Sequence, residues 1–74
     1  MNQPPKYGFI ETNRLENLIK NKGVLICTQC DDMGISRSTM YHLRKGHRMP
    51  NTYTLAVMSD YYGVSVDYLL GRSL

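Results

Sequence analysis

The chain has 74 residues, which is enough for one domain with a small core. Its apolar content of 42% is ordinary for a globular protein, and its net charge is +3. No run approaches the roughly 20 apolar residues that a membrane-spanning helix needs, and the first residues lack the apolar core of a secretory signal. Two cysteines are too few for a disulfide framework. We therefore expect a cytoplasmic protein with reduced thiols and no membrane contact.

The first residues differ in pattern from the rest of the chain. Residues 1–11 carry two prolines, a glycine and no periodic pattern, so we expect a flexible N-terminal arm ahead of a domain at 12–74. A first helix should open that domain, because apolar residues recur there at i, i+3 and i+4, namely Leu15, Leu18 and Ile19.

Capping residues mark the two ends of this helix. Thr12 or Asn13 suits its N-cap, and Glu16 lies three residues after Asn13, as in a capping box. Gly23 suits the left-handed position that commonly ends a helix. The pattern therefore predicts a helix from about Thr12 to Gly23.

A second, shorter helix is expected over about residues 25–33. Its inner stripe consists of Ile26, Cys30 and Met33, at positions that share one face of a helix. Gly34 follows and turns the chain into the next element.

The third expected helix, over residues 36–45, has two different sides. Ser36 suits its N-cap and Gly46 its end. Met40 and Leu43 lie three apart on an apolar side, while the other side carries donors and cations from Arg37, Tyr41 and Arg44. A helix of this width fits the major groove of B-form DNA.

Two more helices complete the pattern. Asn51 caps a fourth that runs through Tyr62, and Ser65 caps a fifth whose buried side is formed by Leu69 and Leu70. Five helices joined by short loops, without any segment of β-type alternation, predict a compact all-α domain.

Positive charge is concentrated on the third expected helix and the loop after it. No acidic residue occurs between Asp32 and Asp60, and that interval holds the four cations Arg37, Arg44, Lys45 and Arg48. The rest of the chain has a net charge of about −1. A cationic surface gathered on one segment is typical of a protein that binds a polyanion.

Spaced landmarks over residues 12–71 point to a known family. They are Gly23, the segment 34–39 (GISRST), Leu43, Gly46, Pro50, Thr54, Leu55 and the segment 62–71 (YGVSVDYLLG). On these landmarks the chain resembles the Cro/repressor-type helix-turn-helix DNA-binding family (lambda-repressor-like, XRE family). The resemblance implies a five-helix domain whose helix-turn-helix is formed by its second and third helices.

The resemblance also implies roles for individual residues. In this family the third helix enters the major groove of double-stranded DNA. The positions that read bases correspond here to Arg37, Ser38 and His42, with Tyr41 beside them. The positions that suit phosphate oxygens are Ser36, Thr39, Lys45, His47 and Arg48.

These roles lead to a functional expectation. We expect a sequence-specific transcriptional regulator of phage, prophage or mobile-element type, acting as a repressor. One module of this size makes few base contacts, so a homodimer on pseudo-palindromic operator DNA is expected.

The second helix departs from the family pattern. Leu25 and Ile26 are aliphatic where the family has a small capping residue and a glutamine, and Gln29 stands where a leucine is normally buried. We expect this helix to be rotated or shifted, with Ile26 in place of the missing core leucine.

A zinc site is the first alternative to consider. Cys27 and Cys30, followed by His42 and His47, come near to the spacing of a two-cysteine, two-histidine finger. The interval is one residue short, and the aromatic residue and leucine of such a finger are missing, so we expect no metal or other cofactor. No arrangement of residues favours catalysis, and we expect no enzyme.

A second alternative comes from a different functional class. The same fold could serve as a protein-interaction module, such as an antitoxin or the partner of an antirepressor, because fold does not determine function. In that hypothesis the aliphatic pair Leu25 and Ile26 forms an exposed docking patch for a partner protein.

Overall fold

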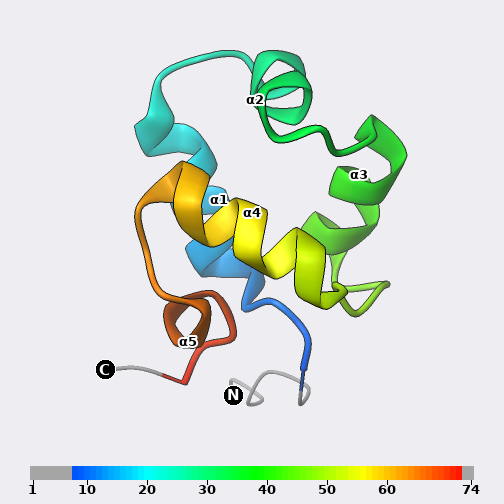
Figure 1. The fold of residues 1–74 in the computed structure, drawn as a ribbon, viewed down its shortest axis with the longest axis vertical. Helices are drawn as coiled ribbons and strands as arrows, with labels where there is room; N and C mark the ends of the chain where they lie inside the picture. The colour runs from blue at the N-terminus through cyan, green and yellow to red at the C-terminus, as the bar shows by residue number, and fades with distance from the viewer. Residues whose placement is uncertain (1–7, 73–74) are drawn as a thin grey trace.

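The computed structural model describes residues 8–72, which form five α-helices and no strand (Figure 1). In Figure 1, α4 crosses in front of α1, with α2 and α3 at the top and right and α5 at the lower left. The prediction of an all-α, five-helix domain is confirmed. The helices are α1 (Thr12–Lys22), α2 (Ile26–Met33), α3 (Arg37–Lys45), α4 (Thr52–Tyr62) and α5 (Val66–Leu69).

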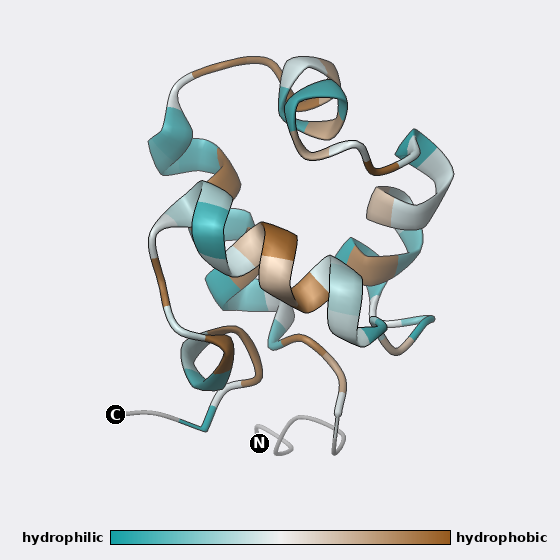
Figure 2. Ribbon diagram, in the orientation of Figure 1, coloured by the Kyte–Doolittle hydropathy of each residue, from teal (hydrophilic) through white to brown (hydrophobic). Residues whose placement is uncertain are grey.

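All five helices contribute to one hydrophobic core. Figure 2 shows that apolar and hydrophilic stretches alternate along the helices, so each helix has a side that it can bury. The buried apolar residues are Ile10, Leu15, Cys30, Met33, Ile35, Met40, Leu43, Met58 and Leu69.

A three-residue turn, residues 34–36, joins α2 to α3. Gly34 takes the left-handed conformation with φ 68°, and its N–H donates to the carbonyl of Asp31. Ser36 then caps α3 by accepting from the backbone N–H of Thr39 at 3.0 Å. Two helices joined by so short a turn form a helix-turn-helix. The positions expected for the turn and for this cap are confirmed.

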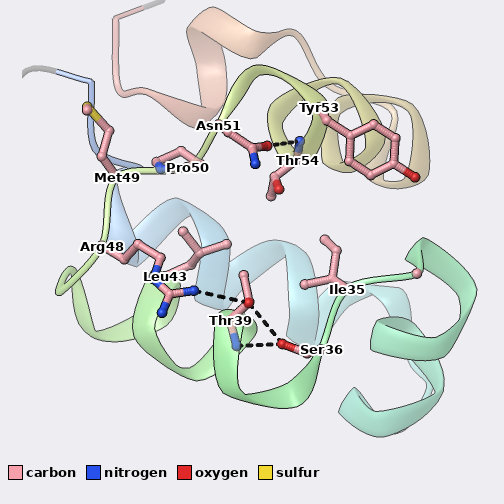
Figure 3. A pocket seen from close by; sticks show the side chains of 11 residues that line it. Ile35, Ser36, Thr39, Leu43, Arg48, Met49, Pro50, Asn51, Tyr53 and Thr54 are labelled. Atoms are coloured by element: carbon pink, nitrogen blue, oxygen red, sulfur yellow. Dashed lines mark hydrogen bonds between the residues drawn. The ribbon is translucent and has the colours of Figure 1, made fainter.

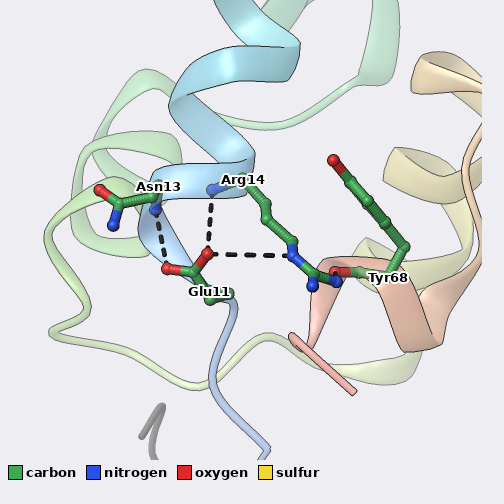
Figure 4. Close-up of polar contacts among 4 residues, drawn as sticks. All are labelled: Glu11, Asn13, Arg14 and Tyr68. Atoms are coloured by element: carbon green, nitrogen blue, oxygen red, sulfur yellow. Dashed lines mark hydrogen bonds and ion pairs between the residues drawn. The ribbon is translucent and has the colours of Figure 1, made fainter. Parts of the chain in front are cut away.

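The start of α1 differs from the prediction. Glu11, not Thr12 or Asn13, is the N-cap, and its carboxylate accepts from the backbone N–H groups of Asn13 and Arg14 at 3.0 and 3.3 Å (Figure 4). The predicted capping box between Asn13 and Glu16 is therefore wrong. A carboxylate can replace a hydroxyl at this position because it also suits the positive end of the helix dipole.

The folded body begins earlier than the predicted domain boundary. Ile10 is only 3% exposed, and the N–H of Glu11 donates to the carbonyl of Leu69 at 2.8 Å. The prediction of a flexible arm through residue 11 is therefore wrong for these two residues, because Ile10 belongs to the core and Glu11 is bonded to α5. The remainder of the predicted arm, residues 1–7, lies outside the described residues.

The predicted rotation of α2 is also wrong. Gln29 itself occupies the core and is fully buried, whereas Ile26 is only partly buried. The Nε2 of Gln29 donates to the carbonyls of Ile19 and Val24 at 3.1 and 3.0 Å, and its Oε1 accepts from the Tyr62 hydroxyl. Because every polar atom of this amide has a partner, glutamine can stand in the position of a buried leucine.

Candidate nucleic-acid interface

The third helix, α3, separates its apolar residues from its polar residues. Met40 and Leu43 are each 1% exposed and face the core. Arg37, Ser38 and Tyr41 are exposed on the opposite side. The helix periodicity places these exposed side chains side by side, so they form a continuous polar surface.

Nine residues were predicted to contact DNA, and none of them is buried. Thr39 and His42 are half-buried. The other seven are exposed, namely Ser36, Arg37, Ser38, Tyr41, Lys45, His47 and Arg48. All nine lie on α3, at its N-cap or in the loop that follows it, and we call this set the α3 surface.

Polar groups at the start of α3 are linked by hydrogen bonds. The Ser36 hydroxyl donates to Thr39 Oγ1 at 2.9 Å, and Arg48 Nη1 donates to the same oxygen at 3.2 Å (Figure 3). Both lone pairs of the Thr39 oxygen are thus engaged, which leaves its O–H as a donor. The contact also holds the guanidinium of Arg48 against the first turn of α3.

A groove lies between the start of α3 and the start of α4. It has a volume of about 240 Å³, and its lining includes Thr39, Arg48, Asn51 and Tyr53 (Figure 3). Tyr53 is 67% exposed, beside the Asn51 cap of α4. The sequence analysis did not assign Asn51 or Tyr53 to the site. The sequence signal that could have indicated them is an aromatic residue, Tyr53, two positions after the helix cap Asn51 and next to the loop that contains Arg48.

Three aromatic rings gather at the end of α3. The ring centroids of His42 and His47 are 5.8 Å apart, and Tyr41 lies 5.4 Å from the first and 6.4 Å from the second. The Nζ of Lys45 lies 5.8 Å from the centre of the Tyr41 ring. This end of the α3 surface therefore combines hydrogen-bonding rings with a cation.

One cation of the basic segment is already paired within the fold. Arg44 donates to the two carboxylate oxygens of Glu16 at 3.0 and 3.1 Å, an interaction that joins α3 to α1. The hydrogen bond to Glu16 raises the pKa of Arg44. The charge offered at the surface therefore comes mainly from Arg37, Lys45 and Arg48.

The two cysteines lie on α2. Cys27 is half-buried, while Cys30 belongs to the core, where burial raises the pKa of its thiol. Within residues 8–72, no three side chains of the metal-binding types come together. In the same part of the chain, no helix is both long and apolar enough to cross a membrane.

Comparison with known proteins finds a similar transcriptional regulator. The chain is 35% identical over 60 residues to the HTH-type transcriptional regulator AnsR of Bacillus subtilis (strain 168). The similarity is to a regulator, not to an enzyme. The match covers 81% of this chain and 52% of AnsR, so the chain spans about half the length of that relative. No protein-family model matches the chain, and no solved structure gives a significant match.

Proposed function

We propose that this protein is a sequence-specific DNA-binding transcription regulator that inserts α3 into the major groove. The observation that carries the proposal is the α3 surface, a continuous exposed polar face opposite the buried Met40 and Leu43. Helix-turn-helix proteins enter the major groove with a second helix that follows the first after a short turn, and α3 follows α2 after a turn of three residues. The similarity to the regulator AnsR supports the same function.

Residues in the first half of the α3 surface are proposed to read bases. The guanidinium of Arg37 suits a bidentate contact with O6 and N7 of guanine, worth about 1–3 kcal/mol of discrimination against other bases. Ser38 and His42 offer both donors and acceptors, and the exposed ring of Tyr41 lies beside them.

A second group is proposed to hold the phosphates on either side of the groove. Lys45 and Arg48 supply positive charge and His47 supplies its ring. At the helix start Thr39 keeps its O–H as a donor, beside the capping Ser36. The groove beside Arg48 adds the Asn51 amide and the Tyr53 hydroxyl to this group.

The regulator is proposed to be a repressor of phage, prophage or mobile-element type that binds as a homodimer. The chain supplies one short reading helix of nine residues, which contacts only a few base pairs. Two copies on a pseudo-palindromic operator, with half-sites about one helical turn apart, would double those contacts. Occupancy of such an operator excludes the polymerase.

Selection of bound sequences from a random duplex pool tests this proposal. We expect enrichment of an inverted repeat whose half-sites are about 10 base pairs apart, centre to centre. Enrichment of a single half-site would contradict binding as a dimer. A pool that is not enriched at all would contradict sequence-specific recognition.

A second candidate function is a protein-interaction module, and one observation favours it. Leu25 is 73% exposed and Val24 is 45% exposed at the start of α2. Ile26, which was expected to share this patch, is partly buried and packs against the core. Exposed neighbouring aliphatic residues are typical of a contact surface for another protein. The partner would be a toxin or an antirepressor.

Co-expression with the product of a neighbouring toxin-like gene tests this second candidate. We expect a complex on size-exclusion chromatography that Leu25→Ser weakens and that Arg37→Ala leaves intact. A complex lost equally with both variants would contradict a docking site at Leu25.

A further inference from the structure

Two histidines, His42 and His47, lie together at the end of α3. The backbone N–H of His47 donates to the carbonyl of His42 at 2.9 Å, and the centroids of the two rings are 5.8 Å apart. Within residues 8–72, no carboxylate lies within ion-pair distance of either imidazole. Both rings also contact Tyr41 on the exposed side of the helix.

Charged groups of both signs lie on α3, on the loop after it and on the helices packed against it. On α3 itself, Lys45 lies over the Tyr41 ring and Arg44 is paired. The following loop contributes Arg48, which is bonded to Thr39. From the helices packed against α3, the acids are Glu16 on α1, which binds Arg44, and Asp31 and Asp32 on α2, the latter accepting from Tyr61.

Protonation changes what this pair offers to an anion. A neutral imidazole has one donor and one acceptor, whereas an imidazolium has two donors and a positive charge. The negative charge of DNA placed against the two rings would attract an imidazolium more strongly than a neutral imidazole, and binding would therefore favour proton uptake.

We propose that DNA binding is linked to protonation of the His42–His47 pair, so that the protein binds duplex DNA more tightly as the pH falls. This inference rests on the proposed function and names a regulation of the same site. The sign follows from linkage, because a complex that holds more protons than its free components is favoured at lower pH. The ligand of the pair is duplex DNA, whose phosphate oxygens would contact His47 while base acceptors contact His42.

Fluorescence-anisotropy titration of one labelled duplex at constant salt tests this inference. For the unaltered protein we expect binding about tenfold tighter at about pH 5.5 than at about pH 7.5. The double variant His42→Gln with His47→Gln should bind more weakly and lose most of this pH dependence. Lys45→Gln is the matched control, because it also removes a surface cation yet should keep the pH dependence.

The outcomes separate this inference from the proposed function. Binding that is equally tight at both pH values overturns the inference and leaves the proposed function standing, as does a double variant that keeps the full pH dependence. Absence of binding at every pH overturns both. Nuclear magnetic resonance titration of the two imidazoles, with and without the duplex, should show both rings protonated at higher pH in the complex.

Discussion

The hydroxyl of Tyr62 donates a 2.6 Å hydrogen bond to Oε1 of Gln29 inside the helix bundle. The same amide donates to the carbonyls of Ile19 and Val24, so one buried side chain ties α4 and the end of α1 to α2. Among the described residues, no buried side-chain polar atom lacks a partner. This network fixes the position of α2 and, through the turn at Gly34, the direction of α3.

Replacing Tyr62 with phenylalanine should destabilise the fold. The variant leaves Oε1 of Gln29 buried without a donor, which costs about 1–3 kcal/mol. Urea unfolding followed by circular dichroism measures the loss. A Tyr62→Phe protein as stable as the original would contradict the role of this bond.

Stability should fall in alkaline solution because of the same tyrosine. Burial raises the pKa of Tyr62 well above its usual range. The folded state then holds a proton that the unfolded chain releases above about pH 10. The contribution of Tyr62 to stability is therefore constant below that pH and falls above it by at most about 1.4 kcal/mol per pH unit.

Urea unfolding between about pH 9 and 11, the range in which tyrosine ordinarily titrates, measures this pH dependence of stability. Tyr62→Phe should show a shallower fall than the original protein. Tyr53→Phe is the matched control, since that side chain is largely exposed, and should retain the original slope. If stability fell equally steeply with pH in all three proteins, groups other than Tyr62 would cause the loss of stability in alkaline solution.

The ion pair between Glu16 and Arg44 should contribute modestly to stability. Both side chains are partly exposed, at 46% and 35%, so Glu16→Gln should cost less than about 1 kcal/mol even though the contact is bidentate. The loss should shrink at high salt because the ions screen the pair. A double-mutant cycle with Arg44→Gln in urea isolates the interaction, and a coupling that salt leaves unchanged would contradict its electrostatic origin.

Local signals in the sequence predicted much of the fold. The glycines after α1, α2 and α3 and the caps Ser36 and Asn51 act through a few neighbouring residues, and all of them end or begin helices as expected. The apolar pair Met40 and Leu43 was predicted correctly for the same reason, since helix periodicity alone places it in the core.

Interactions between residues far apart in the chain were not predictable. From the sequence alone, the polar side chain of Gln29 does not predict a core position. It can be buried because the hydroxyl of Tyr62, 33 positions later, donates to it. Ile10 lies in a segment without periodicity, and its place in the core depends on the contact of Glu11 with Leu69. The groove beside Arg48 likewise depends on how α4 packs, so the sequence did not assign Asn51 and Tyr53 to the site.

Arg37→Ala should weaken binding to the selected operator more than binding to unrelated DNA. Loss of a bidentate guanine contact costs about 1–3 kcal/mol on the specific sequence, while a phosphate contact would be lost on all sequences alike. Titration with both duplexes at one salt concentration measures the difference. Lys20→Ala removes an exposed cation from α1 and should leave both affinities nearly unchanged. If Arg37→Ala reduced the affinity for both duplexes equally, Arg37 would contact the DNA phosphates and not a base.

Salt dependence of duplex binding tests most directly whether the α3 surface meets DNA. Anisotropy titration from about 50 to 200 mM salt should give an affinity that falls linearly on logarithmic axes, with a slope of about −2 to −3 for each protomer bound. Lys45→Ala should reduce the steepness by about one unit per protomer, because one phosphate contact is lost. No binding at the lowest salt, or an affinity independent of salt, would contradict the account.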